Sequence, residues 1–295
     1  MTASADFQHA VVRDLAELLL GAAPWHTGCE IPRERLLGAH GLALLHQLDR
    51  DPAPLLAILA QRPACRRLGR YVEALLWAWC QLAPHCSELH ANLPVRDGGR
   101  TLGEFDLLLR LDGEPWHVEV ACKYYLVVGR QAAQWLGPNL HDAWLRKFAK
   151  LEQQLRLSRH PLAQAVLPAG WQDCRVGSLL RGRFFHRDAP VTPAPLNPLA
   201  PAGWWRPLAE PWPGEQNASV RYMHLPRLRW LGSAGGEQTG GGSAASLRAQ
   251  LADYDSPQQI AVLQQNGDGV WQEAGRGFIV PGSWLESDML TLAEA

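Results

Sequence analysis

The chain has 295 residues, of which 47% are apolar, so it can bury a sizeable core, and wholesale disorder is excluded. Its 28 basic and 29 acidic groups give a net charge of -1, which excludes bulk polybasic character. Only three of the basic residues are lysines, Lys123, Lys147 and Lys150. Because arginine cannot replace lysine where a compact, titratable ammonium is needed, these three positions are of interest.

Charge and composition divide the chain into three segments. The middle of the chain, residues 62–231, carries a net charge of +8, whereas residues 1–61 (-3) and 232–295 (-6) are acidic. We predict an N-terminal helical segment over 1–61, a core over 62–187 and a Pro/Trp-rich, β-rich region over 188–295. A polyanion that binds the middle segment would be attracted by the positive charge of that segment, even though the net charge of the whole chain is near zero.

The first 187 residues predict helices, then strands, then a helix and a strand. Helical spacing begins around residues 11–19, and further helices are predicted over 32–48 and 66–83. The hydrophobic period then changes to two, and Gly-containing turns at 97–99 and 112–113 predict an antiparallel three-stranded meander. The predicted strands of the meander are residues 89–95, 102–111 and 117–126.

A long helix is predicted after the meander. Asn139 is its expected N-cap, and Asp142 is placed three residues on, where it favours the helix dipole. A strand is predicted over 176–186, so the order helix, meander, helix, strand indicates an α/β core. The apolar stripe of the long helix consists of Leu140, Trp144, Phe148, Leu151 and Leu155.

The last hundred residues are predicted to be a β-rich elaboration. Eight prolines between residues 190 and 213 argue against regular structure there, and residues 232–246 are predicted to form a flexible loop. Asn266-Gly267 marks a hairpin. Strand-like runs occupy residues 220–231, 259–263, 270–273 and 278–280.

Compartment and membrane association are predicted from what the sequence lacks. The six cysteines form no Cys-x-x-Cys pair and have no His partners at zinc spacing, so they are interpreted as reduced packing residues. No signal peptide is predicted, and the longest uncharged apolar stretch, residues 74–83, is too short to span a bilayer. We therefore expect a cytoplasmic protein without membrane association.

Two neighbouring predicted strands carry the residues that could perform chemistry. Asp106 lies in an otherwise apolar run, where a carboxylate is costly unless it is paired or binds a metal. Glu119 and Lys123 share one face of the next strand, together with His117. Two carboxylates can hold Mg²⁺ or Mn²⁺, and a nearby ammonium can orient water and stabilise developing charge.

This pattern resembles the PD-(D/E)XK nuclease-like superfamily, which includes the restriction endonucleases. The Gly-Glu-Phe-Asp and His-x-Glu-Val-Ala-x-Lys-Tyr-Tyr-Leu phrases, beginning at Gly103 and His117, are similar to those of an uncharacterised bacterial family placed in it. The resemblance implies a restriction-endonuclease-like core, with Asp106 as a metal ligand and Lys123 as the catalytic lysine. It also places an acid two residues before the lysine, where this chain has Ala121.

Glu119 and Glu73 are the candidates for the missing second ligand. Glu119 lies four residues before Lys123, so their Cα atoms are expected roughly 13 Å apart, a looser arrangement than the superfamily's. Glu73 is the only charged residue between Tyr71 and Ser87, and some superfamily members carry a metal-site Glu on this helix. Glu73 could instead pair with an arginine at the helix start, namely Arg66, Arg67 or Arg70.

Other interpretations of these side chains stay open. Glu119 and Lys123 could be solvated on an exposed strand face, and His117 is expected at the surface or hydrogen-bonded in preference to binding a metal. Glu104 is expected to flank the site. Candidates for nucleic-acid contact follow on the long helix, where a solvated flank is an equally good interpretation: Arg146, Lys147, Lys150 and Gln154.

The sequence therefore predicts a metal-dependent nuclease-like protein that hydrolyses phosphodiester bonds of DNA or RNA. The alternative is a catalytically silent protein of the same fold that binds nucleic acid or a protein partner through the basic middle segment.

Overall fold

The computed structural model describes residues 5–286, except 130, 191, 236–240 and 268. Its helices are α1 (Ala10–Leu20), α2 (Arg33–Leu37), α3 (Gly41–Arg50), α4 (Ala53–Ala60), α5 (Leu68–Leu82), α6 (Trp144–Leu155), α7 (Pro161–Val166), α8 (Ala244–Leu251) and α9 (Gly282–Leu285), with 3-10 turns η1 (Ala132–Gln134), η2 (Leu157–Arg159) and η3 (Arg227–Arg229). Its strands are β1 (Cys86–Asp97), β2 (Arg100–Leu111), β3 (Glu114–Val127), β4 (Trp135–Leu136), β5 (Arg175–His186), β6 (Gly203–Pro207), β7 (Val220–Leu225), β8 (Gln258–Gln265) and β9 (Trp271–Val280).

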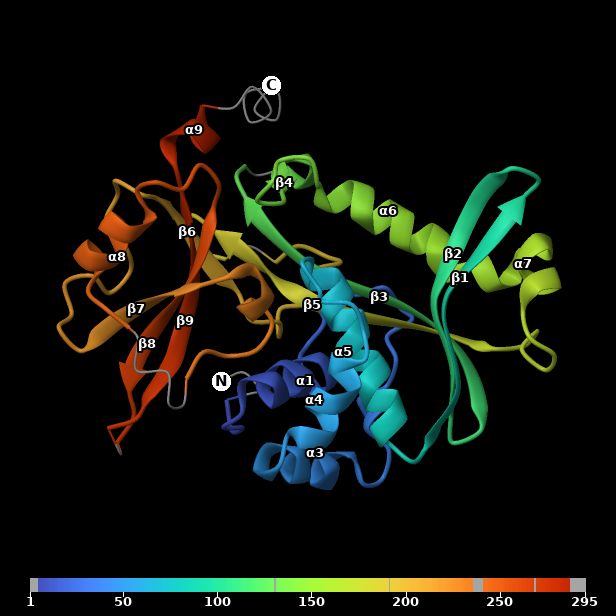
Figure 1. Ribbon diagram of the computed structural model, residues 1–295. Coiled ribbons are helices and arrows are strands. Elements are labelled where there is room, and N and C mark those ends of the chain that lie inside the picture. The colour runs from blue at the N-terminus through green and yellow to red at the C-terminus, as the bar shows by residue number, and fades with distance from the viewer. Residues whose placement is uncertain (1–4, 130, 191, 236–240, 268, 287–295) are drawn as a thin grey trace.

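The described strands form one nine-stranded, mostly antiparallel sheet in a mixed α/β fold (Figure 1). Its order is β1-β2-β3-β5-β6-β9-β8-β7, with β4 paired to β3. The pairings of β5 with β3, of β6 with β5 and of β9 with β6 are parallel, whereas the other pairings are antiparallel. The sheet therefore runs from the predicted core into the C-terminal region without interruption.

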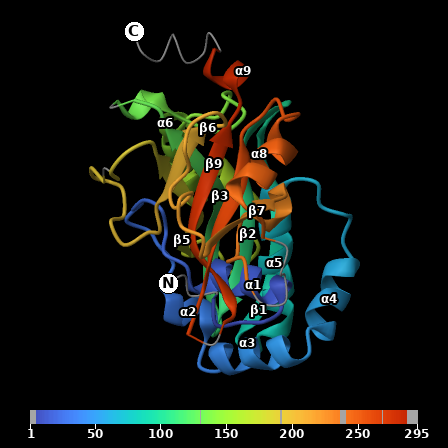
Figure 2. The same cartoon turned by 90° about the vertical axis from the view of Figure 1, so that its left-hand side faces the viewer.

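Helices cover both faces of the central strand β3 (Figure 2). The β3 side chains Val118 and Tyr124 belong to the apolar cluster that includes the buried face of α5. Ala121 and Tyr125 point to the opposite face and pack with Trp144 and other buried residues of α6. This alternation follows from the two-residue period of a strand. Even-numbered residues of β3 therefore face α5, and odd-numbered residues face α6.

The predicted order of helix, three-stranded meander, helix and strand is confirmed. α5, β1, β2, β3, α6 and β5 succeed one another, and the turn at Asp112-Gly113 has the positive φ angles of a tight hairpin, 50° and 79°. The hairpin at Asn266 is also confirmed, because its amide donates to the Val270 carbonyl over 2.9 Å.

Several predicted boundaries are wrong. The long helix begins at Trp144 and not at Asn139, because Gly137 and Leu140 form a hydrogen-bonded turn in which Leu140 has a φ of 62°. The predicted helix over 32–48 is two helices, α2 and α3, separated at Gly38, whose φ of 65° a helix cannot contain.

The C-terminal predictions also need correction. The proline-rich stretch contains a strand after all, β6, because its prolines leave residues 203–206 free to pair. The runs 270–273 and 278–280 are one strand, β9, and the run 220–231 is a strand only as far as Leu225. The predicted flexible loop 232–246 overlaps α8 from Ala244 onward, while its residues 236–240 lie outside the described part of the chain.

Candidate active site

The candidate site forms where two strands of the sheet separate. β2 pairs with β1 along most of its length, but it pairs with β3 only over Leu107–Leu111. Asp106 is the first β2 residue beyond this pairing, and its Oδ2 atom accepts a hydrogen bond of 3.0 Å from the Val120 amide of β3. Asp106 is half-buried between the buried residues Phe105 and Leu107, as the apolar run around it predicts.

The Glu119 carboxyl group faces that of Asp106 from β3. Glu119 is 0% exposed, so the interpretation of Glu119 as a solvated charge is wrong. Its Oε1 atom shares a hydrogen bond of 2.8 Å with His117 Nε2, whereas its Oε2 atom is buried and receives no hydrogen bond from a donor among the described residues. Burial, reinforced by the Asp106 carboxyl group, raises the pKa of Glu119 to about 9.

His117 supports this pair from within the protein. Its side chain is 0% exposed and hydrogen-bonded, so of the two expected positions, at the surface or hydrogen-bonded, it takes the second. The ring lies edge-on against Phe105 at a centroid distance of 4.7 Å. Burial lowers the pKa of His117 to about 4, so the ring is neutral near neutral pH and supplies no charge to Glu119.

The lysine that faces the two carboxyl groups is Lys147 of α6. Burial lowers the pKa of Lys147, and the Lys123 ammonium lowers it further, whereas Asp106 and Glu119 act in the opposite direction. Lys123 lies nearby but forms an ion pair with Asp142, with its side chain 31% exposed. Asn139 fixes the Asp142 turn by accepting a hydrogen bond of 3.2 Å from the Asp142 amide.

Glu73 reaches the same pocket from the other face of the sheet. Where β2 has left β3, side chains of α5, β3 and α6 line one cavity. Glu73 Oε2 accepts a hydrogen bond of 2.7 Å from Arg70, so the predicted pairing with an arginine at the helix start is observed. Burial raises the pKa of Glu73 and Arg70 opposes this, while Asp106 and Glu104 raise it further.

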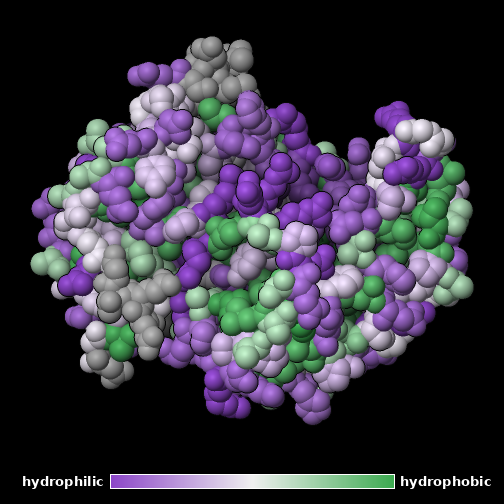
Figure 3. Space-filling view, viewed as in Figure 1, coloured by the Kyte–Doolittle hydropathy of each residue, from purple (hydrophilic) through white to green (hydrophobic). Residues whose placement is uncertain are grey.

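The pocket has a volume of about 660 Å³ and is lined by Glu73, Asp106, Lys123, Asp142 and Lys147, among others. In the view of Figure 3, hydrophilic side chains gather across a hollow in the middle of the molecule, above the start of α5. Asp106 and Glu104 line the pocket, whereas Glu119 is completely buried. The basic residues of the lining are Arg66, Arg67, Arg70, Lys123, Lys147 and Arg227.

The other candidates for nucleic-acid contact lie apart from the pocket lining. Arg146 and Lys150 are exposed on α6, and Arg146 donates to the His141 carbonyl over 2.7 Å. Gln154 is half-buried, and its side-chain oxygen is buried without a hydrogen-bond partner among the described residues. Asp142 and Arg227 line the pocket but were not among the predicted site residues, since each depends on a contact distant in sequence.

Asp106 and Glu119 are the residues that could hold a metal ion. Over the described residues, no three His, Cys, Asp or Glu side chains are grouped closely enough to do so. The facing pair nonetheless brings a buried oxygen of Glu119 beside the Asp106 carboxyl group. Two carboxylates with water in the remaining positions suit Mg²⁺, which usually keeps several waters.

The buried Glu119 predicts a pH-dependent stability in metal-free buffer. The folded state keeps a proton on Glu119 up to a pH of about 9, whereas the unfolded chain releases it near the ordinary glutamate pKa of 4.5. Because burial also lowers the pKa of His117 from 6.5 to about 4, His117 contributes the opposite slope below a pH of about 6.5. The free energy of unfolding should therefore fall mainly between pH values of about 6.5 and 9, by up to about 1.4 kcal/mol per pH unit. Urea unfolding at a series of pH values, in EDTA, measures this fall.

Glu119→Gln removes that titration, so its free energy of unfolding should fall less steeply with pH than that of the wild type. Glu152→Gln, at an exposed position of α6, is the matched control and should follow the wild-type curve. Parallel curves for the wild type and Glu119→Gln would contradict the assignment of a buried, protonated Glu119.

The structure thus defines a mixed α/β protein in which Asp106, backed by the buried Glu119, and Lys147 line a pocket rich in basic side chains. The chain belongs to the family described as a domain of unknown function, DUF1853, whose match covers residues 12–280. No curated protein and no solved structure matches the chain. None of the described helices has both the length and the apolar character needed to cross a membrane.

Proposed function

We propose that this protein is a metal-dependent nuclease that hydrolyses phosphodiester bonds of nucleic acid, with a core related to the PD-(D/E)XK nuclease-like superfamily. The proposal rests on the position of Asp106, which is hydrogen-bonded to β3 next to the buried Glu119 and lines one pocket with Lys147. Two facing carboxyl groups favour a cation between them, because a bound cation would compensate the negative charge that burial otherwise suppresses by keeping Glu119 protonated.

In this proposal each group has a distinct role. Asp106 and Glu119 would hold Mg²⁺ or Mn²⁺, and His117 holds the Glu119 carboxyl group in place through its hydrogen bond. Such a cation polarises the phosphodiester and makes water a better nucleophile at neutral pH. Lys147 stabilises the negative charge that develops on the phosphoryl oxygens as water attacks phosphorus and the bond to the leaving sugar oxygen breaks.

The two pocket lysines should therefore differ in importance. Lys147 lines the pocket with Asp106 and interacts electrostatically with both carboxyl groups, whereas Lys123 is held by Asp142. We expect Lys147→Met to lower the cleavage rate by about 100-fold or more, as is typical when one charge-stabilising group is removed, and Lys123→Met to lower it less. Arg156→Met, at an exposed position just after α6 and outside the pocket lining, is the control and should keep wild-type cleavage.

Incubation of the purified protein with labelled single-stranded, duplex and branched DNA, and with RNA, tests the proposal. Cleavage is expected in Mg²⁺ or Mn²⁺ and not in EDTA. A larger loss in Lys123→Met than in Lys147→Met would contradict the roles assigned to the two lysines.

The second candidate function is nucleic-acid binding without catalysis. It is favoured by Ala121, which stands where the superfamily has an acid and which packs in the apolar cluster beneath α6. Salt-sensitive binding of nucleic acid, combined with no cleavage in any divalent metal, would support this function in place of the first.

A further inference from the structure

Three guanidinium groups gather on one wall of the pocket, and none of them has a carboxylate partner among the described residues. Arg66 and Arg67 precede α5, and Arg227 begins η3, which packs against α5 although about 160 residues separate them. All three side chains are exposed, and no ion pair joins any of them to an acidic group in the described part of the chain. By contrast, Arg70 on the same wall pairs with Glu73.

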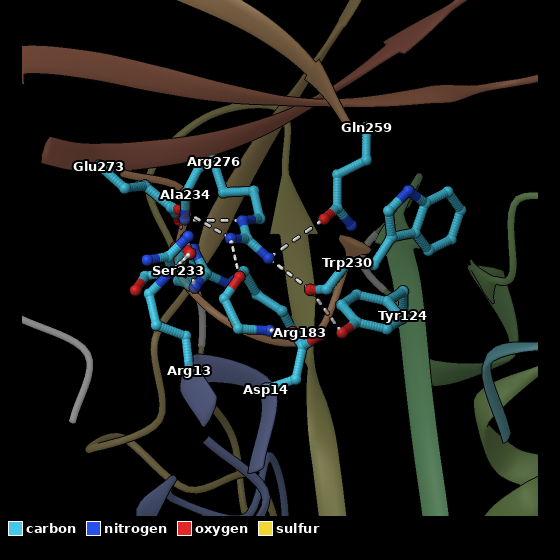
Figure 4. Close-up of polar contacts among 12 residues, drawn as sticks. Arg13, Asp14, Tyr124, Arg183, Trp230, Ser233, Ala234, Gln259, Glu273 and Arg276 are labelled. Atoms are coloured by element: carbon cyan, nitrogen blue, oxygen red, sulfur yellow. Dashed lines mark hydrogen bonds and ion pairs between the residues drawn. The ribbon is translucent and has the colours of Figure 1, made fainter. Parts of the chain in front are cut away.

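A buried polar network fixes the part of this wall that comes from the C-terminal region (Figure 4). The Trp230 carbonyl accepts hydrogen bonds from Tyr124 of β3, over 2.8 Å, and from Arg276 of β9. The Arg276 side chain also donates to the Gly232 carbonyl over 2.8 Å, and its exposed fraction is only 2%.

The N-terminal helix α1 completes the attachment. Asp14 accepts a hydrogen bond of 2.8 Å from the Gly232 amide, and Arg13 donates to the Ser233 carbonyl over 2.9 Å. Elements from both ends of the chain thus hold the segment that carries Arg227. The Arg227 guanidinium lies 5.3 Å from the centre of the Trp230 ring, which adds a local contact.

The pocket lining also carries a second set of positive groups from other elements, namely Lys123 of β3, which pairs with Asp142, and Lys147 of α6. Asp106 lines the pocket together with both sets. A mononucleotide or a single phosphate would need only one set, whereas a chain of phosphates can contact both while one phosphodiester lies at the carboxyl pair. The cavity volume of about 660 Å³ is that of a small-molecule site, which suits a short stretch of one strand and not the cross-section of a duplex.

We infer that Arg66, Arg67 and Arg227 bind the backbone phosphates of a single nucleic-acid strand that crosses the pocket. The identity of the reacting bond rests on the proposed nuclease function, but the binding itself does not. Guanidinium groups suit this role because they stay charged and match the geometry of phosphate oxygens.

Fluorescence anisotropy in EDTA, where no metal-dependent cleavage can occur, tests this inference. The probes are a labelled oligothymidylate of about 20 nucleotides, longer than the ~4–16 nucleotides that one single-strand-binding fold covers, and a duplex of the same length. We expect the double variant Arg67→Glu/Arg227→Glu to bind the single strand at least about 10-fold more weakly. The slope of log affinity against log salt concentration should also be shallower than for the wild type. The expected difference is about 0.7 for each phosphate that the variant no longer neutralises.

Arg50→Glu/Arg221→Glu is the matched control, since it changes the net charge equally at exposed positions away from this pocket. The inference is overturned if the wild type does not bind the single strand, if both double variants lose affinity equally, or if the duplex binds as tightly as the single strand. If Arg67→Glu/Arg227→Glu alone loses affinity for the single strand, and the wild type cleaves no nucleic acid in Mg²⁺ or Mn²⁺, the binding surface is upheld. The same result refutes the nuclease proposal.

Discussion

Asp106→Asn is expected to abolish metal-dependent cleavage, with a loss of at least about 1,000-fold. The substitution keeps the shape of the side chain and its position where β2 leaves β3, but it removes the negative charge that would hold the cation beside Glu119. A single charge-stabilising group in an active site typically contributes ~10²–10³ in rate, and here the cation's own contribution is lost as well. Initial rates of oligonucleotide cleavage, measured with Mg²⁺ and with Mn²⁺, provide the comparison.

Asp112→Asn serves as the control for this experiment. Asp112 lies at the turn between β2 and β3, with its side chain 54% exposed, so the same chemical change there should leave the cleavage rate unchanged. Cleavage by Asp106→Asn at the wild-type rate would exclude Asp106 from the catalytic site.

Arg276→Met is expected to produce the largest loss of stability. The Arg276 side chain is 2% exposed, and its removal would leave the Glu273 carboxylate, with a 5% exposed side chain, without its main partner. Breaking a buried ion pair from one side costs about 3–5 kcal/mol. In a chain of this size we expect the midpoint of thermal unfolding to fall by roughly 10 °C.

Two further variants give this prediction its internal controls. The double variant Arg276→Met/Glu273→Met removes both charges, and it should recover much of the loss because a buried ion pair is often replaceable by apolar groups. Arg187→Met breaks an exposed pair with Glu210 and should cost less than about 1 kcal/mol. Equal losses in Arg276→Met and Arg187→Met would show that the buried network does not stabilise the fold.

The order of the secondary structure was predictable because each signal is local. The alternation along β2 and β3 and the glycine turns between them depend on neighbouring residues, and both are observed. Asp106 stood out for the same reason, as a carboxylate within an apolar run. By contrast, the start of α6 was misplaced because Leu140 adopts a positive φ, which no neighbouring residue signals.

The details of the site were less predictable, since they depend on long-range contacts. Strand alternation places Glu119 and Lys123 on one face but does not reveal that the first is 0% exposed and the second is paired with Asp142. The position of Lys147 beside the carboxyl pair depends on how α6 packs on β3. Arg227 lies in the pocket lining because the network around Arg276 holds the neighbouring Trp230, and that network connects elements from both ends of the chain.

The proposed function depends above all on a divalent-cation site formed jointly by Asp106 and Glu119. Isothermal titration of Mn²⁺ into the wild type, Asp106→Asn, Glu119→Gln and Asp112→Asn tests this site without depending on the choice of nucleic acid. We expect saturable Mn²⁺ binding by the wild type and Asp112→Asn, and its loss in Asp106→Asn and Glu119→Gln. No Mn²⁺ binding by the wild type, or undiminished binding by both site variants, would show that the carboxyl pair is not a cation site.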